Sequence, residues 1–152
     1  MSELKDRLRT DLTAAMKSRD SLRSSTLRLL LSAVTTAEVA GKQQRELGDD
    51  EVVAVLGTEA KKRREAAAAF ADAGRAESAE KERAEAAIIA GYLPDQLDDA
   101  EIEALVSETV AELGVAGDGP RAMGRVMGAL QAKVRGRADG AAVAAAVRRQ
   151  LG

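Results

Sequence analysis

Apolar residues recur along the chain at intervals of three and four, which is the spacing of one face of an α-helix. The first of these stripes begins at Leu4 and ends at Met16, which we expect on its buried face. Similar stripes predict six further helices, over residues 21–40, 52–73, 77–90, 99–113, 120–134 and 140–151. Alanine, leucine, glutamate, lysine and arginine, the strongest helix formers, dominate the segments between the glycines and prolines. The sequence therefore predicts an all-α protein.

Residues with capping preferences stand at the predicted ends of these helices. Asp20 or Ser21, Asp98 and Asp139 can cap helix N-termini, and Gly74 and Gly114 are suited to end helices. Pro120 occupies a position where we expect the first residue of the sixth helix.

The segment Gly91-Tyr92-Leu93-Pro94 interrupts the helical pattern. Proline disfavours a helical conformation of the residue before it, so the chain must turn or extend at Leu93. We expect a boundary between two subdomains here. Residues 1–91 would form a bundle or hairpin pair of about four helices, and residues 92–152 a three-helix subdomain.

The composition excludes several kinds of chemistry. The 152 residues include no His, no Cys and no Trp, with one Phe and one Tyr. Cys/His metal sites, Ser-His-Asp and Cys-His catalysis and disulfides are therefore excluded. Two aromatics also cannot form the stacking surfaces that hold single-stranded nucleic acid. We predict no catalytic residues, no bound metal and no cofactor.

Membrane association is not expected either. No run of about 18 apolar residues is present that could span a bilayer. The first ten residues alternate in charge where a signal peptide would be apolar. We therefore predict a cytoplasmic protein.

Charge is strongly segregated in the last third of the chain, although the formal net charge is only −2. Residues 95–119 contain eight acidic side chains and no basic one, whereas residues 120–152 contain seven basic and one acidic. A basic surface that attracts phosphate is therefore expected after Gly119. Its candidate phosphate contacts are Arg121, Arg125, Lys133, Arg135 and Arg137.

The predicted turn at Gly136 displays Arg135 and Arg137 on either side of a glycine. Arginine offers a planar fork for phosphate, and the following helix, beginning at Gly140, presents free backbone N–H groups. Asp139 is equally suited to cap that helix, and its carboxylate would then occupy the same N–H groups. Both interpretations of this turn remain open at the level of sequence.

Two further features allow two interpretations each. Gly124 and Gly128 lie four apart on one predicted helix, which favours tight packing within the subdomain; a Met-rich adaptable surface is the alternative. Arg19, Arg23 and Arg28 flank the start of the second helix and could reach phosphate. Nearby carboxylates, those of Asp11 and Asp20, could instead pair with them.

Several blocks of sequence closely resemble the YqeY proteins, the small bacterial members of the GatB/YqeY family. The most specific blocks are Tyr92-Leu93-Pro94-Asp95-Gln96-Leu97, residues 123–130 (MGRVMGAL) and residues 136–140 (GRADG). The chain departs from the usual pattern at Gly48, where Thr or Ser is common, and at Ala141, where Lys often follows the glycine.

This resemblance implies an all-helical fold of two subdomains. It also implies kinship with the tail of the B subunit of the tRNA-dependent Asp/Glu amidotransferase, which contacts tRNA. The resemblance accordingly implies a link to carbon–nitrogen ligase activity with glutamine as amido-N-donor. It supplies no catalytic residue for any position of this sequence.

The leading hypothesis is a non-catalytic helical module that binds structured RNA, with tRNA as the expected case. Recognition would be of backbone and shape, because aromatic residues are almost absent. The alternatives are a protein-interaction module whose basic surface meets an acidic partner, and an accessory component of a glutamine-dependent amidotransferase complex.

Overall fold

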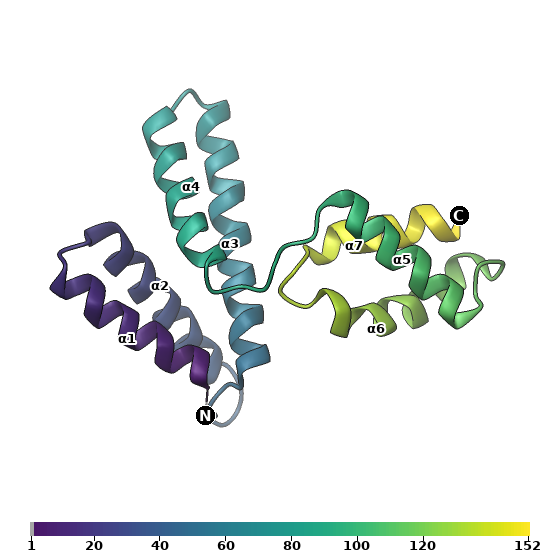
Figure 1. Cartoon of the computed structure of the whole chain (residues 1–152), viewed down its shortest axis with the longest axis horizontal. Helices are drawn as coiled ribbons and strands as arrows, with labels where there is room; N and C mark the ends of the chain where they lie inside the picture. The colour runs from purple at the N-terminus through teal and green to yellow at the C-terminus, as the bar shows by residue number, and fades with distance from the viewer. Residues whose placement is uncertain (1) are drawn as a thin grey trace. The chain divides into compact units, whose positions relative to one another are not determined.

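The computed structural model describes residues 2–152, and every regular element in that range is helical (Figure 1). Their bounds are α1 Glu3–Lys17, α2 Ser21–Glu38, α3 Asp49–Asp72, α4 Ala76–Ala90, α5 Asp99–Leu113, a 3₁₀ helix η1 Gly119–Ala122, α6 Met123–Val134 and α7 Gly140–Leu151. The all-α prediction is confirmed, and each helix begins and ends within three residues of its predicted bounds.

The helix ends show why these bounds are predictable. Three helices begin after an aspartate whose carboxylate accepts an N–H from the first turn: Asp20 for α2, Asp98 for α5 and Asp139 for α7. Two end at a glycine with a left-handed backbone, Gly74 after α3 (φ +74°) and Gly114 after α5 (φ +65°).

Two positions differ from their predicted roles. Pro120 lies in η1, and α6 begins three residues later at Met123. Met16, expected on the buried face of α1, is 51% exposed. Residue 16 lies about 80° around the helix from the buried Leu8, whereas Ala15 lies within about 20° of it and takes the buried position.

By its internal contacts the chain divides into two compact units, one reaching to Leu93 and one from Pro94 to Gly152. In the first unit α1 and α2 form one antiparallel hairpin and α3 and α4 another (Figure 1). Its core is made by Leu8, Leu27, Leu30, Val34, Val52, Leu56 and Ile89, with smaller residues between them. The core of the second unit contains Ile102, Val106, Val126, Leu130, Val143, Val147 and Leu151.

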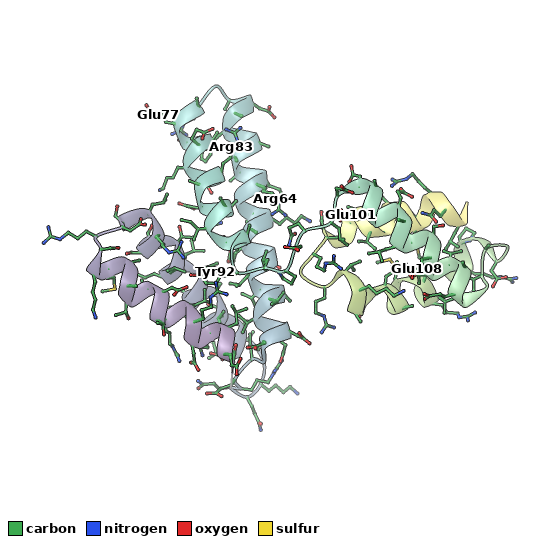
Figure 2. All side chains as sticks on the ribbon, viewed as in Figure 1. Arg64, Glu77, Arg83, Tyr92, Glu101 and Glu108 are labelled. Atoms are coloured by element: carbon green, nitrogen blue, oxygen red, sulfur yellow. The ribbon has the colours of Figure 1, made fainter. Side chains whose placement is uncertain are left out.

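Tyr92 is buried in the core of the first unit, although the sequence-based boundary placed it in the second (Figure 2). Its hydroxyl donates to a carboxylate oxygen of Asp11 at 2.5 Å and accepts from Arg23 Nη2 at 3.1 Å. The guanidinium of Arg7 lies 4.8 Å from the centre of the tyrosine ring. The end of α4 is thereby bound to both α1 and α2.

A buried ion pair joins the other end of the first hairpin to the loop after it. Glu38, only 6% exposed, accepts from Lys5 Nζ at 2.7 Å and from the backbone N–H of Leu47 at 3.1 Å. These two donors, the Lys5 side chain foremost, hold the pKa of Glu38 below its ordinary value. The loop leading to α3 is therefore attached to α1 and α2 through one carboxylate.

The α3–α4 hairpin is held by an arginine among glutamates. Arg63 lies 3.2 Å from a carboxylate oxygen of Glu85 and 3.8 Å from those of Glu59 and Glu82. All four side chains are at least partly buried, which strengthens their attraction relative to exposed pairs. Toward the tip of the hairpin the other buried side chains are small alanines, Ala67 and Ala79.

We predict that Tyr92 titrates above its ordinary pKa of 10.0 in the native protein. Burial raises its pKa first, and the hydrogen bond to Asp11 raises it further. The chain has a single Tyr and no Trp, so the ultraviolet absorbance of tyrosinate reports this residue alone. The midpoint should return to the ordinary value in denaturant.

Asp11→Asn should lower the native midpoint, because the charged acceptor is lost. Asp6→Asn, an exposed change on the same helix, should leave the midpoint unaltered. A native midpoint at or below the denatured one would contradict the network described for Tyr92.

Stability should also depend on the ionisation of Glu38. Since its folded pKa lies below the ordinary 4.5, the stabilisation is complete above pH 4.5 and is lost as the pH falls through the folded value. We expect the free energy of unfolding, measured with urea, to fall less on acidification in Glu38→Gln than in the parent. Equal losses in the two proteins would show that other carboxylates account for the acid sensitivity.

Candidate nucleic-acid interface

In the second unit, the acidic segment of the sequence folds against the basic one. Lys133 Nζ on α6 lies 3.2 Å from a carboxylate oxygen of Glu112 on α5. Arg149 on α7 pairs with Glu103 on α5, and this pair together with Gln150 lowers the pKa of Glu103. Part of the positive charge after Gly119 is therefore neutralised across helices, while Glu101 and Glu108 remain exposed on α5 (Figure 2).

The turn between α6 and α7 has an internal structural role. Arg137 Nε donates to the carbonyl of Asp95 at 3.1 Å, and Nη1 donates to the carbonyl of Lys133 at 3.2 Å. The side chain of Gln96 donates to the carbonyl of Gly136 at 2.7 Å. Gly136 itself has φ +71°, a conformation that side chains rarely adopt. The turn thus anchors the chain that follows Pro94.

Asp139 adopts the capping role that was one of the two interpretations of this turn. Its carboxylate accepts the N–H of Ala141 at 3.2 Å and so caps α7, which begins at Gly140. The first-turn N–H groups of α7 are consequently shared with a carboxylate that repels an incoming anion. Arg135 is exposed at the end of α6.

Arg121 and Arg125 have a different environment. Both are exposed, Arg121 in η1 and Arg125 in the first turns of α6. Neither side chain makes a hydrogen bond or an ion pair with any residue between 2 and 152. Their full charge is available to a ligand.

Gly124 and Gly128 are also exposed, on the same helix as Arg125. A Cβ added at either glycine would meet no atom within 4 Å. The prediction of tight packing at these glycines is therefore wrong, because α6 packs through Val126 and Leu130 instead. The methionines of the alternative interpretation, Met123 and Met127, are partly buried and pack against the core.

We call Arg121, Gly124, Arg125 and Gly128 the α6 face. It combines two unpaired cations with a strip of backbone that no side chain covers. A bulky polyanion can approach such a surface closely, because nothing larger than hydrogen projects at the glycines.

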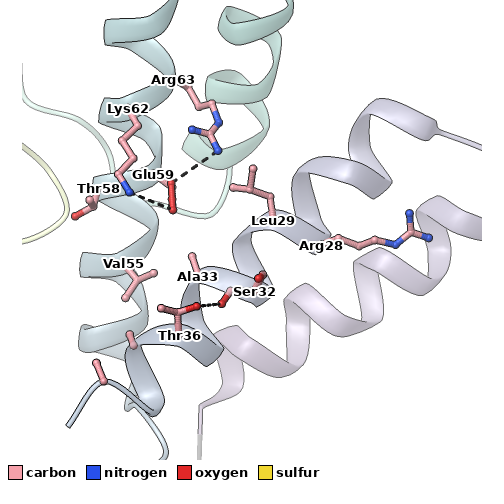
Figure 3. Close-up of a pocket in the computed structure, with 12 residues that line it drawn as sticks. Arg28, Leu29, Ser32, Ala33, Thr36, Val55, Thr58, Glu59, Lys62 and Arg63 are labelled. Atoms are coloured by element: carbon pink, nitrogen blue, oxygen red, sulfur yellow. Dashed lines mark hydrogen bonds and ion pairs between the residues drawn. The ribbon is translucent and has the colours of Figure 1, made fainter.

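The first unit contains a groove between α2 and α3, with a volume of about 840 Å³ (Figure 3). Its floor is apolar, with Leu29, Ala33 and Val55. At its rim Glu59 pairs with Lys62 at 3.7 Å and Arg63 at 3.8 Å. The groove offers shape and apolar contact, but its lining includes no His or Cys and its lone carboxylate is already paired.

Two broader findings concern the described chain as a whole. Across residues 2–152, no three or more carboxylates converge in a way that could hold a metal ion. None of the helices in this range is both long and apolar enough to cross a bilayer.

The family model for YqeY-like proteins matches residues 5–151, nearly the entire chain. The chain belongs to the YqeY-like family. No curated protein matches it. In this YqeY-like chain, residues 95–97 hydrogen-bond to the turn at Gly136 and Arg137. Tyr92, which precedes them, belongs to the core of the first unit.

We predict that Gly128→Ala stabilises the YqeY-like protein by about 0.5–1 kcal/mol, because glycine is costly inside a helix and the added methyl enters open space. Thermal unfolding should show a higher midpoint. The same substitution at Gly74, where φ is +74°, should instead destabilise the protein. Destabilisation by Gly128→Ala would mean that this side of α6 is covered.

Proposed function

We propose that this YqeY-like protein binds the sugar–phosphate backbone of structured RNA, with tRNA as the expected ligand, and that the α6 face makes the principal contact. The observation that carries the proposal is the pair of unpaired arginines, Arg121 and Arg125, beside two exposed glycines. We further propose that the protein acts in the cytoplasm, has no catalytic activity of its own and is related to the tail of the amidotransferase B subunit.

The charge state of these arginines favours phosphate as the ligand. A guanidinium that already binds a carboxylate must exchange one partner for another, whereas an unpaired one gains a charge-assisted hydrogen bond. Each phosphate neutralised also releases counterions, which supplies most of the sequence-independent affinity for nucleic acids.

The rest of the basic segment would act at longer range. Lys133 and Arg137 have internal partners, and Arg135 lies at the far end of α6. We propose that these three side chains raise the local positive potential and steer the polyanion, with weaker direct contacts than Arg121 and Arg125. Because the chain has one Phe and one Tyr, base stacking should contribute little.

The direct test is the affinity for tRNA as a function of salt concentration. If Arg121→Gln/Arg125→Gln removes two phosphate contacts, the slope of log affinity against log salt should flatten by about one to two units. The matched control is Lys42→Gln/Arg64→Gln, which removes the same charge from two exposed positions of the first unit that are unpaired within residues 2–152 (Arg64 is labelled in Figure 2). The control should retain the parent slope.

Equal changes in both double variants would indicate a general charge effect and would overturn the assignment to the α6 face. Retention of a protein partner after nuclease treatment, without any affinity for tRNA, would favour a protein-interaction module instead.

A second double variant tests whether the RNA backbone approaches the glycines of the α6 face, without changing the charge of the protein. Gly124→Gln/Gly128→Gln places two neutral side chains on the α6 face, and glutamine is a good helix former, so folding should be preserved. Affinity for tRNA should fall by about tenfold if the backbone lies on the glycines, equivalent to about 1.4 kcal/mol. Unchanged affinity would show that the ligand contacts the arginines only.

A further inference from the structure

A separate hollow of about 370 Å³ opens beside the turn between α1 and α2 in the first unit. Its lining consists of Met16, Arg19, Ser21, Ser24 and Arg28. We call this the turn hollow. It is lined by two cations and two hydroxyls, and none of its lining residues is acidic.

Both arginines of the turn hollow keep their charge unpaired. Neither Arg19 nor Arg28 has a side-chain hydrogen bond or ion pair within the described residues. The third arginine of this region, Arg23, donates to Tyr92 and is engaged in the core.

The carboxylates that could neutralise the hollow are used elsewhere. Asp20 accepts the backbone N–H of Arg23 at 3.1 Å and caps α2. Asp11 accepts from Tyr92 and lies 3.8 Å from Arg7. An anion entering the turn hollow would therefore meet two unpaired arginines, with the charge of the capping Asp20 partly opposing them.

Ser24 provides an independent indication of a ligand. The residue is 6% exposed and lines the hollow, yet its hydroxyl has no hydrogen-bond partner in the part of the chain that the structure describes. The neighbouring hydroxyls of Ser25 and Thr26 both donate to the carbonyl of Leu22. The Ser24 oxygen is not among the buried unpartnered atoms, so it reaches the open hollow, where its hydroxyl can donate to a bound acceptor.

The spacing of the polar residues adds to this picture. Ser21, Ser24 and Arg28 lie at intervals of three and four on one face of α2, and the two serines stand in its first turn. Arg19 has φ +59°, a left-handed conformation that glycine would adopt at no steric cost. The turn alone therefore does not require arginine at this position.

We propose that the turn hollow binds the phosphate group of a small phosphorylated molecule. Arg19 and Arg28 would supply the charge, and the hydroxyls of Ser21 and Ser24 would donate to phosphate oxygens. Met16, 51% exposed at the same hollow, would contact the apolar part of the ligand. The volume lies near the lower limit for small-molecule pockets, which suits a ligand about the size of a nucleoside monophosphate.

This site is independent of the RNA-binding proposal, because it is built only from residues of the first unit. The test uses the full-length protein with inorganic phosphate, adenosine monophosphate and adenosine as separate probes. Binding is measured by calorimetry, and amide chemical shifts locate it. Both phosphate-bearing probes should shift amides of residues 16–28, with the monophosphate binding more tightly, and adenosine alone should not bind.

The variants separate binding from folding. Arg28→Gln should weaken the affinity for adenosine monophosphate by about tenfold, as expected for one lost charge-assisted hydrogen bond. Ser24→Ala should weaken it by about threefold. Arg19→Gly should weaken it by about tenfold while raising the thermal midpoint, since it removes a side chain from a left-handed position. The control, Arg64→Gln, should retain the parent affinity.

Three results would overturn the proposal. They are no binding of either phosphate-bearing probe, an equal loss of affinity for adenosine monophosphate in Arg28→Gln and Arg64→Gln, and adenosine binding as tightly as the monophosphate. A shift of these amides by tRNA alone, with no response to either phosphate-bearing probe, would also overturn it, because the ligand would then be a macromolecule.

Discussion

The first unit depends on the contact between the Tyr92 hydroxyl and the Asp11 carboxylate. The four helices carry many alanines, which bury little apolar area and specify few unique interlocking positions. Tyr92 supplies the missing specificity, because its ring fills the core while its hydroxyl selects Asp11 on α1 and Arg23 on α2. Without that pairing, the end of α4 would have no directional attachment to the first hairpin.

The same interaction determines which charges remain available at the surface. Because the Asp11 carboxylate accepts from Tyr92 and lies 3.8 Å from Arg7, it is not paired with Arg19 or Arg28 at the α1–α2 turn. A comparable division occurs in the second unit, where Glu112 and Glu103 occupy Lys133 and Arg149 but leave Arg121 and Arg125 unpaired. In both units, internal hydrogen bonds and ion pairs determine which cations remain unpaired.

Local features of the fold could be predicted from the sequence because they depend on neighbouring residues. Helical stripes, aspartate caps and glycine ends involve contacts within about four positions along the chain. The partners of Lys133, Arg137 and Tyr92 lie 21, 42 and 81 residues away, so no local pattern reveals them. Spacing alone likewise could not show that Gly124 and Gly128 face outward, since it is Val126 and Leu130 that take the buried side of α6.

The alanine content of the α3–α4 hairpin has a consequence for how the protein opens. Near its base the hairpin packs large residues, Leu56 and Ile89, whereas toward its tip the buried side chains are Ala67 and Ala79. A buried methyl group contributes far less than a buried isobutyl group. Amide hydrogens near the tip should therefore exchange through local separation of the two helices, while those at the base exchange only on global unfolding. A gradient of protection along the hairpin would follow directly from its side-chain sizes.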